Sequence, residues 1–350
     1  MLASLPRKLS IVVPASFASL LFAELLTFCA EPGSMSLYDE TPFDRGTSLP
    51  CVLRPSARTA WNGTYHENNA RDWRGPEFER TCAHSELRVL AIGDSCTFGK
   101  GVDESDTWPR QLGRMPREEL RTSRTVLVGK LGVNGYSGRD YLEVFATQVR
   151  PIRDDIAVLA CNFDDFPNVL QKVDRAVLHS ERNLRPRIAF ERRSQLGQLA
   201  LFRWARATYD EQNRERDLQQ VETIARGAAG ELHASTNVLQ AKAARLARLV
   251  ETCNAIGADV LMFLRPYESQ VYLDEHSPAP PESSRAIAEP LWIASVDLVE
   301  PFRSQTRSSD PPPRSFVRGD RYHPNASGYE VIARNIGEKL ERRAWLGGSQ

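Results

Sequence analysis

The sequence predicts an α/β fold in which helices pack on a parallel β-sheet of about five strands. Short apolar runs rich in β-branched residues recur from residue 87 onward, which is typical of buried parallel strands. Helical stretches separate several of these runs, as in βαβ units, whose strands lie parallel in one sheet. The predicted strands cover residues 87–92, 125–133, 155–163, 258–264 and 293–299.

An amphipathic helix is predicted after Thr236. Apolar side chains recur there at intervals of three or four residues, which places them on one face of a helix. These residues are Leu239, Ala243, Leu246, Val250 and Cys253. Basic residues occupy the opposite face, so we expect the apolar face to pack on the sheet.

Composition and charge exclude several classes of protein. Among 350 residues, Lys plus Arg and Asp plus Glu both number 45, so the overall charge does not favour nucleic acid as a partner. With 41% hydrophobic and 26% charged residues, the chain is neither disordered nor a membrane protein with many spans. A globular catalytic or binding domain is therefore expected.

The six cysteines show no CxxC pair and no Cys/His spacing that suits zinc, so no metal site is predicted. In an oxidising compartment, Cys51 and Cys82 are able to form a disulfide, and the sequence leaves open whether they do. Cys96, Cys161 and Cys253 lie in apolar contexts, which indicates buried thiols.

Residues 1–30 read as a membrane anchor or signal segment. Arg7 and Lys8 precede the apolar stretch 9–30, which has about the ~20 residues that a helix needs to cross a bilayer. Basic residues on the amino-terminal side favour an anchored protein whose main domain is extracytoplasmic, in the periplasm or at the cell surface. The alternative is secretion after signal cleavage, although Phe28 stands where cleavage prefers a small residue.

The rest of the chain divides into an extension and a larger domain. Residues 31–85 are rich in proline, glycine and polar residues without a sustained period, so we expect an ordered extracytoplasmic extension. Residues 86–346 form the predicted α/β domain. Within it, residues 167–236 are too long for a normal crossover and predict a helical insertion. Its arginines suit a solvated helix face or, alternatively, an anionic leaflet or acidic glycan.

Two distant segments carry the residues of a nucleophilic site. Residues 93–99 (GDSCTFG) follow the first predicted strand and expose Ser95 at the carboxyl edge of the sheet, where ligands bind. Residues 319–325 (GDRYHPN) place Asp320 and His323 on one short turn before a helix that begins near residue 326. A serine hydroxyl needs a base and a carboxylate that orients this base, so the three side chains predict acyl transfer.

These segments resemble the SGNH (GDSL) hydrolase superfamily, and specifically its bacterial members with a single amino-terminal membrane segment. The resemblance covers most of residues 70–340. It rests on four segments of the domain: residues 91–102, residues 131–137, the end of the third predicted strand around Asn162 (the third block), and residues 319–333. Residues 69–77, which precede the domain, also resemble the segment that leads into the domain in these anchored members, and we call them the lead-in. The resemblance implies a three-layer α/β/α sandwich with a flavodoxin-like strand order.

The resemblance also implies a role for each site residue. Ser95 is the nucleophile, His323 is the general base and then the acid, and Asp320 orients His323. The oxyanion hole consists of the backbone N–H groups of Ser95 and Gly135 and a side-chain amide from the third block, each worth about 3 kcal/mol of transition-state stabilisation. No cofactor and no metal is implied.

Two positions depart from the family pattern. Lys130 stands where members often have a supporting asparagine before the second block. The third block usually ends in Asn-Asp, but residues 161–165 read CNFDD, so two registers compete. In one, Asn162 donates to the oxyanion. In the other, Asp164 replaces the asparagine, and an ionised carboxylate only accepts hydrogen bonds, so the chemistry favours Asn162.

The main functional hypothesis is an extracytoplasmic serine ester hydrolase that cleaves an O-acyl ester, such as an acetyl ester, of a glycan or small molecule. The first alternative is an O-acyltransferase that moves acetyl groups onto cell-envelope polysaccharide. The second alternative is a catalytically inactive glycan-binding or scaffold module, because the third block departs from the pattern. The sequence does not identify the acyl and alcohol parts of the substrate or the oligomeric state.

Overall fold

The structure is a computed structural model, and its description covers part of the chain. The described segments are residues 5–30, 42–44, 46, 49, 51–61, 64–77, 85–149, 155–161, 208–209, 212–219, 222–223, 236–274, 285–308, 314–317, 320, 322–343 and 345. The predicted insertion 167–236 therefore lies mostly outside the described residues.

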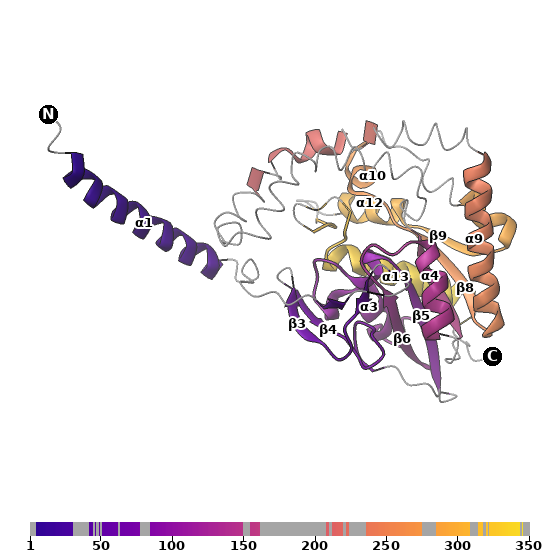
Figure 1. The fold of residues 1–350 in the computed structure, drawn as a ribbon. Coiled ribbons are helices and arrows are strands. Elements are labelled where there is room, and N and C mark those ends of the chain that lie inside the picture. The colour runs from indigo at the N-terminus through magenta and orange to yellow at the C-terminus, as the bar shows by residue number, and fades with distance from the viewer. Residues whose placement is uncertain are drawn as a thin grey trace.

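Five parallel strands form the central sheet (Figure 1). They are β5 (Glu86–Gly93), β6 (Thr125–Gly132), β7 (Ile156–Cys161), β8 (Asp259–Leu264) and β9 (Ala294–Asp297). The spatial order β6-β5-β7-β8-β9 confirms the flavodoxin-like order. β5 and β6 pair over their full length, from Glu86 opposite Thr125 to Gly93 opposite Gly132. Both strands therefore end at the same position along the carboxyl edge of the sheet.

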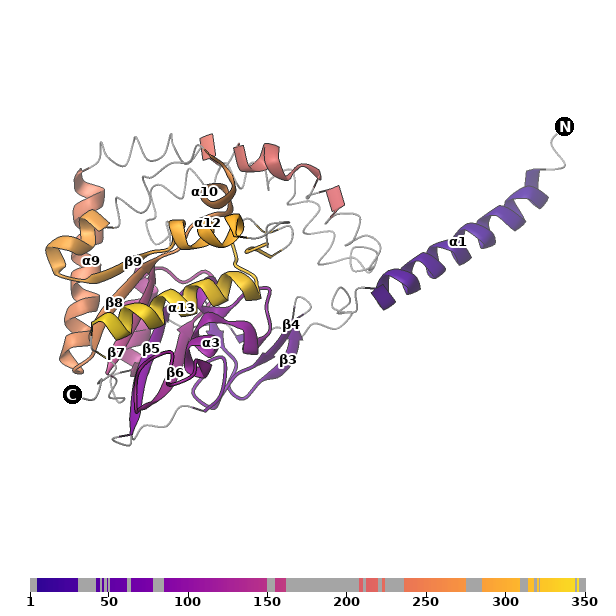
Figure 2. The ribbon, with the colours of Figure 1, turned by 180° about the vertical axis from the view of Figure 1, so that it is seen from behind.

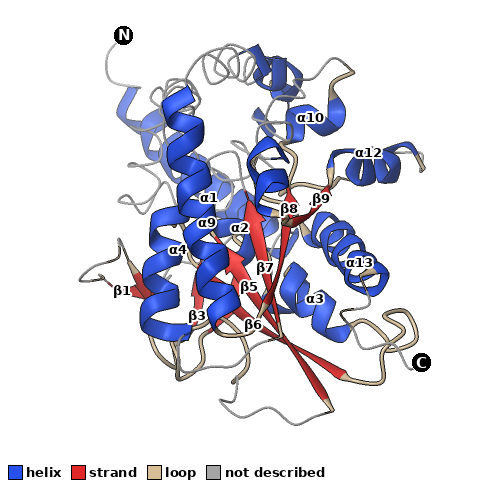
Figure 3. Ribbon diagram, turned by 90° about the vertical axis from the view of Figure 1, so that its right-hand side faces the viewer, coloured by secondary structure: helices blue, strands red, loops and turns tan. Residues whose placement is uncertain are grey.

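Helices cover both faces of the sheet, which confirms the three-layer sandwich (Figure 3). Leu90 and Ile92 of β5 face one core cluster, to which α4 (Gly138–Val144) and α9 (Thr236–Ala255) contribute. The alternating residues of β5 face the other cluster, because successive strand side chains point to opposite faces. The second cluster includes side chains of α3 (Trp108–Arg114), α12 (Val299–Arg307) and α13 (Ala326–Arg342), and Figure 2 shows α13 across this face.

The helix predicted after Thr236 is α9. Its Leu249 and Cys253 are buried in the first core cluster, and Leu246 and Val250 pack against that cluster while partly exposed. The described C-terminal half of the apolar stripe therefore packs on the sheet domain, as its spacing predicts.

A long helix, α1 (Leu5–Ala30), forms over the segment that the sequence analysis assigned to a membrane anchor or signal. Within the part of the chain that the structure describes, no helix is both long enough and apolar enough to cross a membrane. The predicted membrane span is therefore not supported.

The predicted extension contains two small antiparallel pairs. The strands β1 (Phe43–Asp44) and β2 (Val52–Leu53) form one pair, and β3 (Arg58–Trp61) and β4 (Thr64–Glu67) form the other. These strands have four residues at most, which is too short for a period to appear in the sequence. Leu53 and Trp73 are buried in the same core cluster as the central strands, so the extension packs on the sheet domain.

The thiol of Cys51 is free and half-buried, and it donates to the backbone oxygen of Asn134 at 3.7 Å. The possible disulfide with Cys82 is therefore not formed, and Cys82 itself lies outside the described residues. The side chains of Cys96 and Cys253 are buried, as predicted, whereas nothing is described of the side chain of Cys161.

The remaining short elements surround the carboxyl edge and the periphery of the sheet. They are α2 (Ser95–Phe98), η2 (Glu104–Asp106), η3 (Phe145–Val149), α10 (Glu268–Tyr272) and η6 (Glu289–Leu291).

Candidate active site

Ser95 is the first residue of α2, directly after β5. Asp94 caps this four-residue helix, because its Oδ1 accepts a hydrogen bond from the backbone N–H of Cys96 at 2.8 Å. At the other end, Gly99 ends the helix in the left-handed conformation, with φ of 87°. Since Asp94 supplies the cap, the hydroxyl of Ser95 is not used for capping.

The short helix lies tightly against the end of β6. A Cβ atom built on Gly132 would come within 2.3 Å of the backbone nitrogen of Phe98, which no side chain there can avoid. A glycine at this position therefore lets the backbone of α2 approach the strand. The sheet fixes Ser95 both through the end of β5 and through this contact with β6.

Three side chains from the two distant segments form a hydrogen-bonded line. Nε2 of His323 lies 2.8 Å from Oγ of Ser95, and Nδ1 of His323 lies 2.7 Å from Oδ2 of Asp320. His323 is buried, and Asp320 is about one-fifth exposed, at 22% for its side chain. The structure thus brings Ser95, His323 and Asp320 together in the order that acyl transfer requires.

The carboxylate of Asp320 is held in its ionised form. Its Oδ1 accepts hydrogen bonds from the backbone N–H groups of Tyr322 and His323, at 2.9 and 3.0 Å, and Nζ of Lys100 lies 3.9 Å from Oδ2. Burial by itself raises the pKa of Asp320. The charge and hydrogen bond of His323, the charge of Lys100 and the N–H of Tyr322 outweigh burial and hold this pKa well below its usual range.

Neighbouring residues fix the turn that carries Asp320 and His323. Arg265 lies directly after β8. Its Nη1 donates to two backbone oxygens, that of Pro266 at 3.1 Å and that of Tyr322. After the turn, Asn325 caps α13 by accepting from the backbone N–H of Gly328 at 3.0 Å. This helix begins at residue 326, as the sequence predicts.

The predicted oxyanion residues are described only in part. Gly135 lies in the turn between β6 and α4, exposed, with φ of 79°. This turn follows the end of β6, so Gly135 is at the same edge of the sheet as Ser95. Asn162 and Asp164 lie outside the described residues, and the choice between the two registers stays a prediction.

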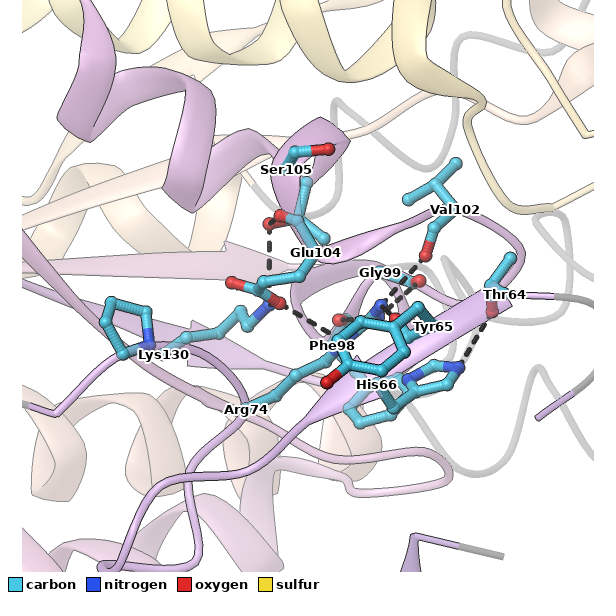
Figure 4. Close-up of polar contacts among 12 residues, drawn as sticks. Thr64, Tyr65, His66, Arg74, Phe98, Gly99, Val102, Glu104, Ser105 and Lys130 are labelled. Carbon is cyan, nitrogen blue, oxygen red and sulfur yellow. Dashed lines mark hydrogen bonds and ion pairs between the residues drawn. The ribbon is translucent and has the colours of Figure 1, made fainter. Parts of the chain in front are cut away.

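The structure adds charged residues that the sequence analysis did not assign to the site. Arg74 and Glu104 lie next to the C-terminal end of α2, together with Lys130 (Figure 4). In the sequence, only the place of Arg74 in the lead-in 69–77 connected it with the family pattern. Glu104 lies in none of the segments that carry the resemblance. Among the described residues, no group of His, Cys, Asp and Glu is arranged to hold a metal ion.

Comparison with known proteins identifies the family. Residues 91–331 match the family model of GDSL-like lipases and acylhydrolases. The chain belongs to the GDSL-like lipase/acylhydrolase family. The matched range includes Ser95, Asp320 and His323, and as a member of this family the protein is a hydrolase that acts on ester bonds. None of the curated proteins matches the chain.

Solved structures of the family are similar to this GDSL-like protein at low sequence identity. An acetylxylan esterase from Geobacillus stearothermophilus is 15% identical, with a TM-score of 0.42 over 73% of this chain and 94% of that one. A lipase/acylhydrolase from Enterococcus faecalis is 11% identical, with a TM-score of 0.43 over 73% of this chain and 96% of that one.

Proposed function

We propose that this GDSL-family protein is a serine esterase that works through an acyl-Ser95 intermediate. The observation that carries the proposal is the line of hydrogen bonds from Ser95 through His323 to Asp320, with both heavy-atom distances below 3 Å. In such a line, the ring nitrogen Nδ1 donates to the carboxylate, and the lone pair of Nε2 faces the hydroxyl of Ser95.

The reaction follows from this arrangement. Nε2 of His323 takes the proton of Ser95 while Oγ attacks the carbonyl carbon of the ester. When the tetrahedral intermediate collapses, the bond to the alcohol breaks, and His323 gives its proton to the leaving oxygen. A water molecule then attacks the acyl carbon and gives a proton to His323, which returns it to Oγ as the acid leaves.

The negative charge that develops on the carbonyl oxygen needs hydrogen-bond donors. We assign this role to the backbone N–H groups of Ser95 and Gly135 and to the side-chain amide of Asn162. Two features support the assignment: Ser95 begins a helix, and Gly135 takes a positive φ in an exposed turn at the same edge of the sheet. The substrate class in this proposal is an O-acyl ester.

We also propose that the hydrolase domain works outside the cytoplasm. Arg7 and Lys8 before the apolar stretch 9–30 support export. So does the exposed apolar surface of α1, which in Figure 1 stands apart from the other elements. Its exposed large side chains are Val12, Phe17, Leu20, Leu21, Phe22, Leu25 and Leu26. A carboxyl-terminal alkaline phosphatase fusion should be active in a bacterial host, and activity only of a cytoplasmic reporter at that position would contradict export.

Hydrolysis of p-nitrophenyl acetate by the full-length chain tests the chemistry. We expect Ser95→Ala to lower kcat by at least about 1,000-fold, because the nucleophile is lost. Ser304→Ala removes an exposed serine hydroxyl of α12 and serves as the matched control. If Ser95→Ala kept the activity of this control, the acyl-serine mechanism would be wrong.

Two further measurements separate the remaining alternatives. Asn162→Ala should cost more kcat than Asp164→Ala if Asn162 is the oxyanion donor, and the reverse result would place Asp164 in that register. Addition of acetylated and free oligosaccharides distinguishes hydrolysis from acetyl transfer. Release of acetate at an unchanged rate in the presence of free sugar supports the esterase, whereas acetylated sugar as the main product would support the transferase.

A further inference from the structure

Three charged side chains, those of Arg74, Glu104 and Lys130, converge beside the backbone of Phe98 and Gly99 (Figure 4). Oε2 of Glu104 lies 3.2 Å from Nε of Arg74 and forms a close ion pair with Nζ of Lys130. The side chain of Arg74 is fully buried, that of Lys130 is 2% exposed, and that of Glu104 is 17% exposed. We call these three residues the charged cluster.

The guanidinium of Arg74 binds the backbone that follows Ser95. Its Nη1 donates to the carbonyl oxygens of Phe98 and Gly99, at 2.8 and 2.7 Å. Its Nη2 donates to the carbonyl oxygens of Val102, at 2.9 Å, and Tyr65, at 3.1 Å. One side chain from the extension thus ties down the C-terminal end of α2 and the loop after it.

The backbone connects these carbonyls directly to the nucleophile. The backbone N–H groups of Gly99 and Lys100 both donate to the carbonyl oxygen of Ser95, at 2.9 and 3.0 Å. Because α2 contains only four residues, a displacement at Gly99 passes to Ser95 within a single helical turn. The same displacement would change the 2.8 Å contact between Ser95 and His323.

Burial of this charged cluster costs free energy. Desolvation lowers the pKa of Lys130 to about 7, although the charge of Glu104 opposes this change. Desolvation also lowers the pKa of Arg74, again against the charge of Glu104. Buried ion pairs are weak contributors to stability compared with well-packed apolar residues, so stability alone is a poor explanation for the cluster. A role in holding the backbone in place accounts for the arginine, because its planar guanidinium directs several N–H donors at fixed carbonyl oxygens.

We propose that Arg74 is a positioning residue for Ser95, which acts through the carbonyl end of α2, and that Glu104 and Lys130 hold Arg74 in place. The proposal rests on the proposed function, since it assigns to Ser95 the role of nucleophile. It makes the extension a working part of the esterase, because Arg74 follows β4 and precedes the sheet.

Two assays on the full-length chain test this role. One is the kinetics of p-nitrophenyl acetate hydrolysis, and the other is the rate at which an ethyl fluorophosphonate probe labels Ser95. For Arg74→Met, we expect kcat and the labelling rate to fall about 100-fold, as for a misplacement of about 1 Å, while KM stays within about threefold. Arg74→Lys should lose most of the same activity, because an ammonium lacks the planar fork.

Arg124→Met is the matched control. Arg124 also donates to a backbone carbonyl, that of Glu86, and pairs with Asp155 at 2.8 Å, but these contacts lie at the amino edge of the sheet. We expect Arg124→Met to change the melting temperature without a change in the labelling rate. All rates are measured well below the melting temperature of each variant, which is determined by circular dichroism.

The outcomes are distinct. If folded Arg74→Met and Arg74→Lys label Ser95 at the wild-type rate, the positioning role is wrong although the esterase stands. If the probe labels the wild type no faster than Ser95→Ala, the proposed function itself fails. If Arg74→Met does not fold, Arg74→Lys and Glu104→Gln decide, and wild-type kcat in both would overturn the proposal.

Discussion

Nε2 of His323 lies 2.8 Å from Oγ of Ser95, although 228 positions separate the two residues in the chain. The contact depends on elements from both ends of the sheet domain. Ser95 follows the interior strand β5, whereas the turn that carries His323 is held by Arg265 after β8 and leads into α13. The pair is therefore formed only when the sheet and its C-terminal helix have packed together.

The role of Asp320 predicts the effect of Asp320→Asn. The amide would donate where the carboxylate accepts, which favours the wrong tautomer of His323, so kcat should fall about 10,000-fold with little change in KM. Steady-state kinetics with p-nitrophenyl acetate measures this loss. Asp297→Asn is a suitable control, because Asp297 accepts from the backbone N–H of Val299 after β9 and does not contact His323. Equal kcat in the two variants would exclude Asp320 from catalysis.

The lowered pKa of Asp320 predicts an acid-sensitive contribution to stability. A carboxyl group whose pKa is lower in the folded than in the unfolded state stabilises the fold fully at pH values above its unfolded pKa, which is 3.8 for aspartate. This stabilisation is lost as the pH falls through the lower, folded pKa. The difference in unfolding free energy between wild type and Asp320→Asn should therefore shrink as the pH falls below 4. Urea denaturation at each pH measures it, and a constant difference down to pH 2 would contradict the shift.

The turn at Gly135 gives a prediction that separates strain from catalysis. Gly135 and Gly257 have φ of 79° and 83°, and a Cβ atom at either position would meet nothing within 4 Å. Alanine at each position should therefore cost about 1 kcal/mol through backbone strain alone. Only Gly135→Ala should also lower kcat, by about 10-fold or more, because it displaces an oxyanion donor. Equal kcat values for the two variants would remove Gly135 from the oxyanion hole.

Much of the architecture was predictable because parallel strands carry a strong local signal. Each of the five strands is an apolar run, and the observed bounds agree with the predicted ranges within about two residues at every end. Ser95, Asp320 and His323 were predictable as a group because their motifs follow the expected elements. Their mutual distances were not, since these depend on long-range packing.

The charged cluster was not predictable from the sequence. Lys130 lies in a strand whose other residues are mostly apolar, and its position alone did not identify Glu104 as its partner. Arg74 precedes the sheet domain and was assigned to an extension without catalytic context. The strands of that extension are too short to show a period, so its packing against α2 appears only in three dimensions.

The buried position of Lys130 gives the last prediction. Its pKa is about 7 in the folded protein and 10.5 when unperturbed, so between these values the unfolded chain holds a proton that the folded chain has lost. Unfolding then takes up a proton, and the stability of the wild type should rise with pH in this window, by about 1.4 kcal/mol per pH unit at most, relative to Lys130→Met. Urea denaturation of both proteins at pH 7, 8, 9 and 10 measures this difference.

The free energy of unfolding of Lys130→Met should therefore exceed that of the wild type by most at and below pH 7, because there the wild type buries a charged ammonium group. Groups that titrate identically in both proteins cancel in the difference. Lys339→Met, in α13, is the control for loss of a lysine side chain outside the charged cluster. A flat difference for Lys130→Met would mean that Glu104 compensates the buried charge of Lys130 completely. Arg74 would then be held by a neutralised pair whose strength does not change between pH 7 and 10.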